Sequence, residues 1–315
     1  MKAHETNIYV AENDKIMGFE AAKYAVERLK RADKEGKKCV MWMMAAPSGF
    51  SFYSSFIGFV ESDESLRNIV TRTSFFQFDD YPIARGDDRF PITFRSLLET
   101  SFFTPLEKVV KTALDISYLE LRGDDSDDSV AEDYQRRLLG YLEDDSCYVL
   151  EVKGIGMDGH WGFHGSETPL DVKPMIMKVP MNELNIQQQM IDWPQYFAKE
   201  SDVPSFAYTA SVPLFMKADT VIDLVPQQTK AFAVLACYGI DAPSQSVPSS
   251  MLITHRDSHS FLTEQSAWAL IEYRKEQVLS NSVVKRLNEI WVNEENPQLQ
   301  EHNQKMMERI LRSLF

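Results

Sequence analysis

The chain has 315 residues, 44% of them hydrophobic, which suits one large globular domain or two smaller ones. Its formal net charge of −14 opposes binding to phosphate backbones and to anionic lipid, so we expect no nucleic-acid partner and no membrane partner. No apolar run approaches the length of a transmembrane helix, and the first residues lack the apolar core of a signal peptide. A cytoplasmic protein is therefore expected.

The first elements in the chain are a helix and a buried strand. Residues 13–36 have helical periodicity, with Asn13 or Asp14 as N-cap and Gly36 as the stop. Residues 37–46 form a short apolar run, typical of a buried strand. Further helices are predicted at 47–62, 91–106 and 227–239, and further strands at 71–83, 146–156 and 218–226. Residues 122–145 are predicted to form an acidic turn followed by an amphipathic helix, and residues 258–277 a strand that runs into a helix.

This alternation of strands and helices predicts an α/β fold, a doubly wound and largely parallel sheet between layers of helices. In such sheets the ligand lies beyond the carboxyl ends of the strands. Three stretches follow predicted strands and carry chemistry: residues 47–51, 79–81 and 154–167. We name the last, "GIGMDGHWGFHGSE", the glycine loop. The acidic "DDSDD" at 124–128 lacks the pattern of a calcium loop and is read as a solvated turn.

The C-terminal part is predicted to add two helices, at 281–293 and 297–315. We expect one α/β domain over residues 1–270 and a helical extension over residues 271–315 packed on it. Cys39, Cys147 and Cys237 fall in core segments without metal-ligand spacing, so buried reduced thiols are expected.

The glycine loop holds the most chemistry. Its glycines let the backbone turn sharply beside a ligand, and His160 can act as an acid or base with Asp158 orienting it. The alternative is a packed loop in which His160 is only hydrogen-bonded. His160 and His164 are four residues apart, a metal-binding spacing on a helix only, and this loop is a poor helix. No metal is expected.

The other two strand ends have functional and structural readings as well. Asp79 and Asp80 are either a general base with an orienting carboxylate or the caps of a turn. The small residues of 47–51 precede a helix and suit a phosphate, although they lack the Walker lysine. Lys230 opens a helix, where it opposes the helix dipole unless it faces an anion; the alternative is a solvent-exposed lysine.

Taken together, the motifs "PSGFSF", "FDDY" and "GMDGHWGF" resemble the glucosamine-6-phosphate deaminase and 6-phosphogluconolactonase superfamily. The corresponding deaminase patterns are a phosphate loop P-T-G-G-T-P, a strand ending M-D-E-Y and a catalytic G-x-D-G-H-x-x-F. The segments "VPSFAYTA", "LVPQQTKAFAVLA" and "VPSSMLITHRDSHSFLTEQSA" follow in the family's order. The resemblance spans roughly residues 15–270.

The resemblance implies roles for individual residues. Asp79 matches the carboxylate that moves a proton between C2 and C1 of the open-chain sugar. His160 matches the ring-opening histidine, and Asp158 its partner. The implied substrate-binding residues are Ser48, Gly49 and Ser51 of the phosphate loop, Asp80 of the strand end, Gly156 of the catalytic motif and the phosphate lysine Lys230.

The sequence departs from the deaminase pattern at several positions. Gly165 stands where the family has the glutamate that completes the catalytic triad, and Glu167 follows two residues later as its replacement. Phe50 replaces a glycine of the phosphate loop. The family's arginine before the V-P strand has no counterpart beyond Lys199.

Three functions follow from the resemblance. The first is isomerisation or deamination of an amino-sugar phosphate such as glucosamine 6-phosphate, which requires no cofactor. The second is hydrolysis of a 6-phosphogluconolactone-like substrate. The third is binding of a sugar phosphate without chemistry. All three functions imply a small-molecule sugar phosphate as partner. Members of the family often form oligomers, so the resemblance also implies a homo-oligomer as one possible state.

Overall fold

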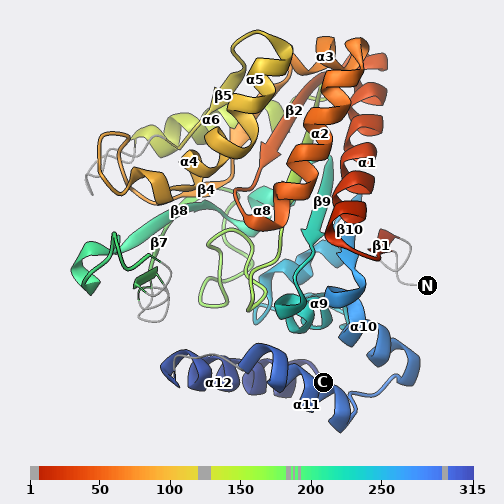
Figure 1. The fold of residues 1–315 in the computed structure, drawn as a ribbon, viewed down its shortest axis with the longest axis vertical. Coiled ribbons are helices and arrows are strands. Elements are labelled where there is room, and N and C mark those ends of the chain that lie inside the picture. Colours follow the sequence, from red (N-terminus) through yellow and green to blue (C-terminus); the bar gives the residue numbers. More distant parts are fainter. Residues whose placement is uncertain (1–6, 120–128, 182–185, 187–188, 191–192, 293–296) are drawn as a thin grey trace.

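Two sheets and their covering helices make up the computed structural model of this protein (Figure 1). The larger sheet has seven parallel strands in the order β1-β10-β9-β6-β2-β3-β5. The smaller is antiparallel, in the order β4-β8-β7. The structure describes residues 7–119, 129–181, 186, 189–190, 193–292 and 297–315. The predicted acidic turn at 124–128 lies outside these residues.

The strands of both sheets are short. They are β1 (Ile8–Ala11), β2 (Lys38–Met43), β3 (Ser74–Gln77), β4 (Asp79–Asp80), β5 (Asp115–Ser117), β6 (Cys147–Lys153), β7 (Ile176–Pro180), β8 (Phe206–Ala210), β9 (Thr220–Val225) and β10 (Ser258–Thr263). The α-helices are α1 (Asp14–Lys34), α2 (Phe50–Ser62), α3 (Glu64–Val70), α4 (Phe94–Leu98), α5 (Thr104–Val110), α6 (Ser129–Leu142), α8 (Val212–Phe215), α9 (Ala231–Tyr238), α10 (Glu264–Glu276), α11 (Asn281–Leu287) and α12 (Pro297–Leu314).

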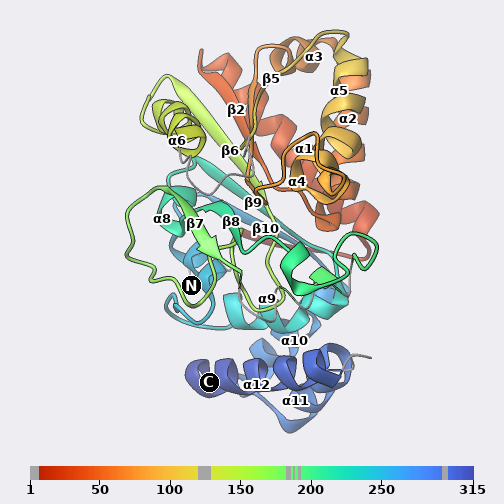
Figure 2. The ribbon, with the colours of Figure 1, turned by 90° about the vertical axis from the view of Figure 1, so that its left-hand side faces the viewer.

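The strand order reverses between β2 and β6. From β2 the chain moves outward to β3 and β5, then returns to place β6 on the other side of β2 and continues to β9 and β10. Figure 2 shows the result, with α1, α2 and α5 on one side of the sheet and α6 on the other. This arrangement confirms the doubly wound α/β prediction. Two loops flank the reversal, one after β2 and the glycine loop after β6, where such folds bind ligands.

Local sequence signals explain the first elements well. Asn13 Oδ1 accepts a hydrogen bond from the amide of Ile16 at 3.1 Å, which confirms the predicted cap of α1. Gly36, just past the helix, has a φ of +76°, a conformation that glycine adopts readily. In β2, Val40, Met41 and Trp42 are fully buried, as expected for a central strand covered on both faces.

One predicted element is wrong in its extent. The strand predicted at 71–83 ends at Gln77, and Asp79–Asp80 form the separate strand β4, which pairs with β8 of the small sheet. The Gln77 side chain causes the break, because its Nε2 donates to the backbone oxygen of Asp79 at 3.0 Å and to Asp80 Oδ2 at 2.5 Å. The two carboxylates therefore leave the main sheet and enter the small one.

The C-terminal helices α11 and α12 lie together at one end of the molecule (Figures 1 and 2). Trp291, between them, is buried and stacks on Phe232 of α9 with ring centroids 4.8 Å apart. Helix α10 runs through residue 270 to Glu276, so the division at residue 270 stays a prediction. The three cysteines are buried and free, as predicted. In the described part of the chain, no helix is long and apolar enough to cross a membrane.

Candidate active site

The glycine loop turns back on itself directly after β6. The amide of Gly156 donates to the His160 oxygen at 3.1 Å, and the amide of Gly159 donates to the Gly156 oxygen at 3.0 Å. A Cβ on Gly156 would overlap the imidazole of His160, so glycine is required for this ring to lie against the backbone. Gly156 thus makes room for His160; its predicted contact with substrate stays untested.

His160 and Asp158 form a close pair. Nδ1 of His160 lies 2.6 Å from Oδ1 of Asp158, which also accepts from the His160 amide at 3.2 Å. Burial alone would raise the pKa of Asp158, but the imidazole and these hydrogen bonds hold it well below its usual range. Asp158 therefore stays ionised and fixes the ring. Among the described residues Nε2 of His160 has no hydrogen-bond partner, so it is available to a ligand.

Glu167 folds back over the glycine that stands in the family glutamate's place. A Cβ on Gly165 would lie 2.7 Å from Oε2 of Glu167. The carboxylate of Glu167 therefore occupies the space where a side chain at position 165 would begin. The absence of a side chain at 165 is what lets a carboxylate from two residues later reach this point.

Asp158, His160 and Glu167 line one cavity of about 360 Å³. Its remaining described lining residues are Tyr81, Phe94, Gly162, Phe163, Gly165, Thr168, Val179, Pro180, Met181 and Gln189. Three of them form an aromatic wall, in which Phe94 and Phe163 are stacked with centroids 5.6 Å apart and Tyr81 lies 5.3 Å from Phe94. Sequence reasoning missed this wall, although Tyr81 and Phe163 are part of the "FDDY" and "GHWGF" motifs.

Asp79 lies behind the cavity rather than in its lining. Its side chain is buried, and a Cβ on Gly162 would lie 3.3 Å from its Oδ2. Within the described part of the chain, no hydrogen bond reaches the Asp79 carboxylate. Burial and, second, the charge of Asp80 raise the pKa of Asp79 well above its usual range. Gly162, which lines the cavity, thus has the Asp79 carboxyl group on its buried side, together with Thr209 and Phe215.

The Asp80 carboxylate accepts hydrogen bonds from three backbone amides. Its carboxylate accepts from the amides of Tyr81 at 2.8 Å, Phe94 at 3.0 Å and Arg95 at 2.9 Å, which ties β4 to the first turn of α4. Burial raises its pKa to about 6 against the effect of these bonds. Of the two alternatives for Asp80, this geometry favours the cap.

The residues predicted to bind phosphate lie apart from this cavity. Ser48 is buried and donates to Gln227 Oε1 at 3.0 Å, and Ser51 donates to Asp14 Oδ1 at 2.6 Å. A Cβ on Gly49 would lie 2.5 Å from the Tyr53 ring. The hydroxyls of Ser48 and Ser51 are therefore both engaged within the protein, and an acidic side chain accepts from one of them.

Lys230 is also engaged. Its Nζ donates to the backbone oxygen of Ile155 at 2.5 Å, at the start of the glycine loop. Burial lowers its pKa to about 8, although the carboxylate of Asp223 acts in the opposite direction. The lysine thus supports the loop from behind, and its predicted role toward phosphate stays untested.

Both ring nitrogens of His164 contact the protein backbone, which indicates a structural role for this histidine. Its Nδ1 accepts from the amide of Val212 at 3.1 Å, and its Nε2 lies 3.2 Å from the oxygen of Thr168. Burial lowers its pKa, which favours the neutral ring. In the part of the chain that the structure describes, no three histidine, cysteine or carboxylate side chains lie together in a group that could hold a metal ion.

A buried polar cluster underlies the glycine loop. Lys153, the last residue of β6, is fully buried and pairs with Asp223 of β9 at 3.1 Å. Its Nζ also lies 3.3 Å from Ser249 Oγ, which donates to the His160 oxygen at 2.9 Å. The cluster therefore connects two strands of the main sheet to the backbone of His160.

The residue after His160 belongs to the same cluster. Trp161 is buried, donates from Nε1 to Glu151 Oε1 at 2.9 Å, and lies under Lys153, whose Nζ is 4.6 Å from the ring centroid. It also stacks on Phe215 with centroids 5.3 Å apart. Burial raises the pKa of Glu151 well above its usual range. His160 is thus held on both sides, by Asp158 and by Trp161.

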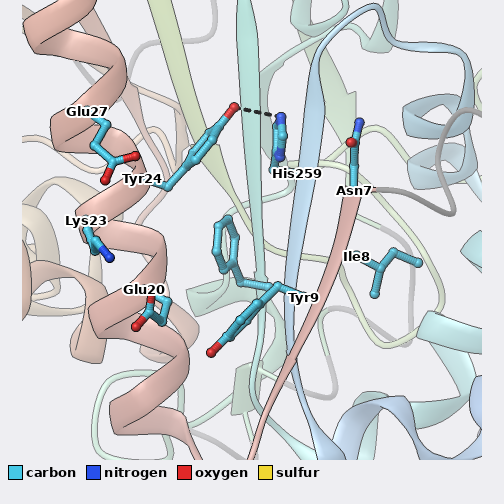
Figure 3. Close-up of a pocket in the computed structure, with 9 residues that line it drawn as sticks. Asn7, Ile8, Tyr9, Glu20, Lys23, Tyr24, Glu27 and His259 are labelled. Carbon is cyan, nitrogen blue, oxygen red and sulfur yellow. Dashed lines mark hydrogen bonds between the residues drawn. The ribbon is translucent and has the colours of Figure 1, made fainter.

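A second cavity, of about 300 Å³, lies between α1 and the β1–β10 edge of the sheet (Figure 3). There the Tyr24 hydroxyl and His259 Nε2 are 2.6 Å apart, and the same nitrogen lies 2.9 Å from Asp257 Oδ1. It opens at the amino ends of β1 and β10, opposite to the glycine loop. Its polar groups join α1 to the sheet, and we assign no ligand to it.

No protein-family model matches this chain. The chain is 24% identical over 254 residues to the glucosamine-6-phosphate deaminase of Streptococcus pneumoniae (strain Hungary19A-6), covering 80% of this chain and 95% of that protein. It is 32% identical over 119 residues to the glucosamine-6-phosphate deaminase of Lacticaseibacillus paracasei, covering 38% of this chain and 47% of that protein.

Solved structures show the same fold. A monomeric glucosamine-6-phosphate deaminase superposes with a TM-score of 0.65 at 18% identity, covering 83% of this chain and 99% of that one. The 6-phosphogluconolactonase from Trypanosoma cruzi gives 0.60 at 11% identity, covering 83% and 96%. The chain is therefore similar in sequence to glucosamine-6-phosphate deaminases and shares the fold of a deaminase and of 6-phosphogluconolactonases.

The first prediction concerns the buried pair of Lys153 and Asp223. We expect Lys153→Met to lower the free energy of unfolding by about 3–5 kcal/mol, because it leaves the Asp223 charge buried without its cation. Adding Asp223→Asn should recover more than half of this loss. Denaturant unfolding checks both, with Lys305→Met, at an exposed lysine, as a control within about 0.5 kcal/mol of wild type. Equal stability of the single and double variants would contradict this account of the pair.

The second prediction concerns Asp79. Its pKa is above the model-peptide value of 3.8 only in the folded protein, so the folded state binds more protons and stability falls as the pH rises from about 4. Asparagine cannot ionise, so the Asp79→Asn variant does not lose stability in this way as the pH rises. Its melting temperature should therefore exceed that of wild type by a margin that grows with pH. Thermal unfolding between pH 4 and 8 measures the margin, with the exposed Asp88→Asn as control. A margin that does not change with pH would refute the assignment.

Proposed function

We propose that the protein opens the ring of an amino-sugar phosphate such as glucosamine 6-phosphate and transfers a proton between C2 and C1. One observation carries the proposal. Asp158, His160 and Glu167 face one cavity, and an otherwise unpartnered carboxyl group, Asp79, lies behind the glycine at its wall. This supplies an acid–base group for the ring oxygen and a separate one for carbon, as aldose–ketose isomerisation requires.

His160 performs the first step. Its Nε2 takes the proton of the C1 hydroxyl and passes it to the ring oxygen O5, so the C1–O5 bond breaks and an aldehyde forms at C1. Asp158 keeps Nδ1 protonated and oriented, which leaves Nε2 for this exchange. Glu167, whose carboxylate occupies the space beside Gly165, supports the charge that develops on His160 during ring opening.

Asp79 performs the second step. Its carboxylate removes the proton from C2 while the aldehyde oxygen takes a proton from the ammonium group, which gives an enolamine. The Asp79 carboxyl group then returns its proton to C1, which leaves an iminium group at C2. Water then replaces the amine at C2, so glucosamine 6-phosphate and water give fructose 6-phosphate and ammonia. The raised pKa makes this carboxylate a stronger base than an exposed one. The aromatic wall of Tyr81, Phe94 and Phe163 packs against the apolar face of the sugar.

Two other functions remain as alternatives. In lactone hydrolysis, Nε2 of His160 would activate water; the similarity to lactonase structures favours this reaction. A protein that binds sugar phosphate without chemistry is favoured by the engaged phosphate turn, in which Ser51 donates to Asp14. These functions differ in their need for Asp79, since proton transfer at carbon requires it, whereas hydrolysis and binding do not.

Proton NMR in deuterated water tests the proposal. We expect wild type with glucosamine 6-phosphate to incorporate deuterium and to form fructose 6-phosphate. Asp79→Asn should lose this exchange by about 10²–10⁴-fold while still binding the sugar, because only the carbon proton transfer needs this base. Asp88→Asn, at an exposed carboxylate, is the matched control.

Three results would overturn the proposal or select an alternative. Exchange that persists in Asp79→Asn removes this residue as the base. Binding by wild type without exchange favours the non-catalytic function. Turnover of 6-phosphogluconolactone that is lost in His160→Ala and kept in Asp79→Asn favours the hydrolase.

A further inference from the structure

Helix α12 of the C-terminal extension reaches the glycine loop. Arg309 Nη2 lies 3.4 Å from Oγ of Ser166, the residue between Gly165 and Glu167. The backbone oxygen of Ser166 also accepts from Gln245 Nε2 at 3.0 Å. Figures 1 and 2 show α12 at the end of the molecule toward which the glycine loop projects. The extension therefore contacts the segment that carries Glu167.

The helix is held in this position along its length. Met307 and Ile310 are buried, and Asn303 Nδ2 donates to the Trp291 oxygen at 3.3 Å. At its end, the ring of Phe315 lies 5.0 Å from that of Tyr273 in α10. Packing of this kind fixes which side of α12 faces the loop.

His302 lies on the same side of α12 as Arg309, since residues seven apart share a face. It is half-buried, and burial lowers its pKa. The carboxylates of Asp158 and Glu167 act in the opposite direction, and the charge of Arg309 lowers the pKa further. His302 and Arg309 therefore lie on one side of α12, and Arg309 contacts the residue between Gly165 and Glu167.

The cavity itself lacks a cation for an anionic substrate. None of its described lining residues is lysine or arginine, whereas Asp158 and Glu167 bring two carboxylates. Lys230 donates to the backbone of Ile155 outside the lining. Arg309, in contrast, has no carboxylate partner among the described residues and is exposed to solvent. An unpaired guanidinium at the rim of an acidic cavity is a binding group for phosphate.

We propose that Arg309, assisted by His302, binds the phosphate of the sugar substrate at the rim of the cavity, so that the C-terminal extension forms part of the site. This inference rests on the proposed function for the identity of the substrate. It assigns phosphate binding to α12 in place of the turn at 47–51 and Lys230. A phosphate there would be bound by the planar guanidinium of Arg309, whose positive charge offsets the repulsion between the phosphate and the Glu167 carboxylate.

Calorimetric titration of the full-length protein tests this assignment with glucosamine 6-phosphate and with glucosamine. We expect Arg309→Gln to weaken binding of the phosphorylated sugar about 10-fold or more, because a charge-assisted contact is lost, and to leave binding of glucosamine unchanged. Arg312→Gln is the matched control: it removes the same charge from the same helix at an exposed residue paired with Glu308. His302→Gln should weaken binding less than Arg309→Gln.

Each other outcome overturns the assignment in a distinguishable way. If Lys230→Gln weakens binding of the phosphate and Arg309→Gln does not, the phosphate lies at the predicted turn and the proposed function stands. If Arg309→Gln and Arg312→Gln weaken binding equally, only the general field of the helix acts. If wild type binds neither sugar, the proposed function falls together with this inference.

Discussion

The Lys153–Asp223 pair is the interaction on which the candidate site depends. It is fully buried at the carboxyl ends of β6 and β9, and through Ser249 it reaches the backbone of His160. Removing two charges from water is costly, and only good geometry with further hydrogen bonds offsets that cost. Tyr238 and Ser249 supply such bonds. The result is a rigid base from which a loop rich in glycine can still present His160 at one fixed place.

The support from the Lys153–Asp223 pair explains how the glycine loop can differ from the deaminase sequence pattern and still keep its shape. Trp161 anchors the loop just after His160, so the residues beyond it can depart from the family sequence without moving the imidazole. At position 165 a glycine leaves room, and Glu167 fills it from two residues further on. On the other side of Gly162, Asp79 is buried without a hydrogen-bond partner among the described residues. Such a carboxyl group weakens the fold, which is a common property of reactive groups.

The sequence indicated the sheet, most helices and the glycine loop because these depend on local signals: periodicity, the Asn13 cap and the run of glycines. It could not show contacts between distant segments. For example, the capping role of Asp80 depends on amides of α4, which begins fourteen residues later in the chain and meets the carboxylate only in the folded protein. The Ser51–Asp14 bond and the approach of Arg309 to Ser166 depend in the same way on packing. The same is true of Phe94, which no motif marks as a cavity residue.

The most direct test of the account is a crystal structure with an open-chain analogue, 2-amino-2-deoxyglucitol 6-phosphate, which cannot close its ring. The account predicts that C1 and C2 lie against Gly162, within reach of the Asp79 carboxylate, and that O5 lies beside Nε2 of His160. Gly162 is the lining residue that brings the analogue nearest to this carboxylate, since a Cβ there would lie 3.3 Å from Asp79 Oδ2. An analogue bound in the cavity with its C2 remote from Asp79 would contradict the central claim.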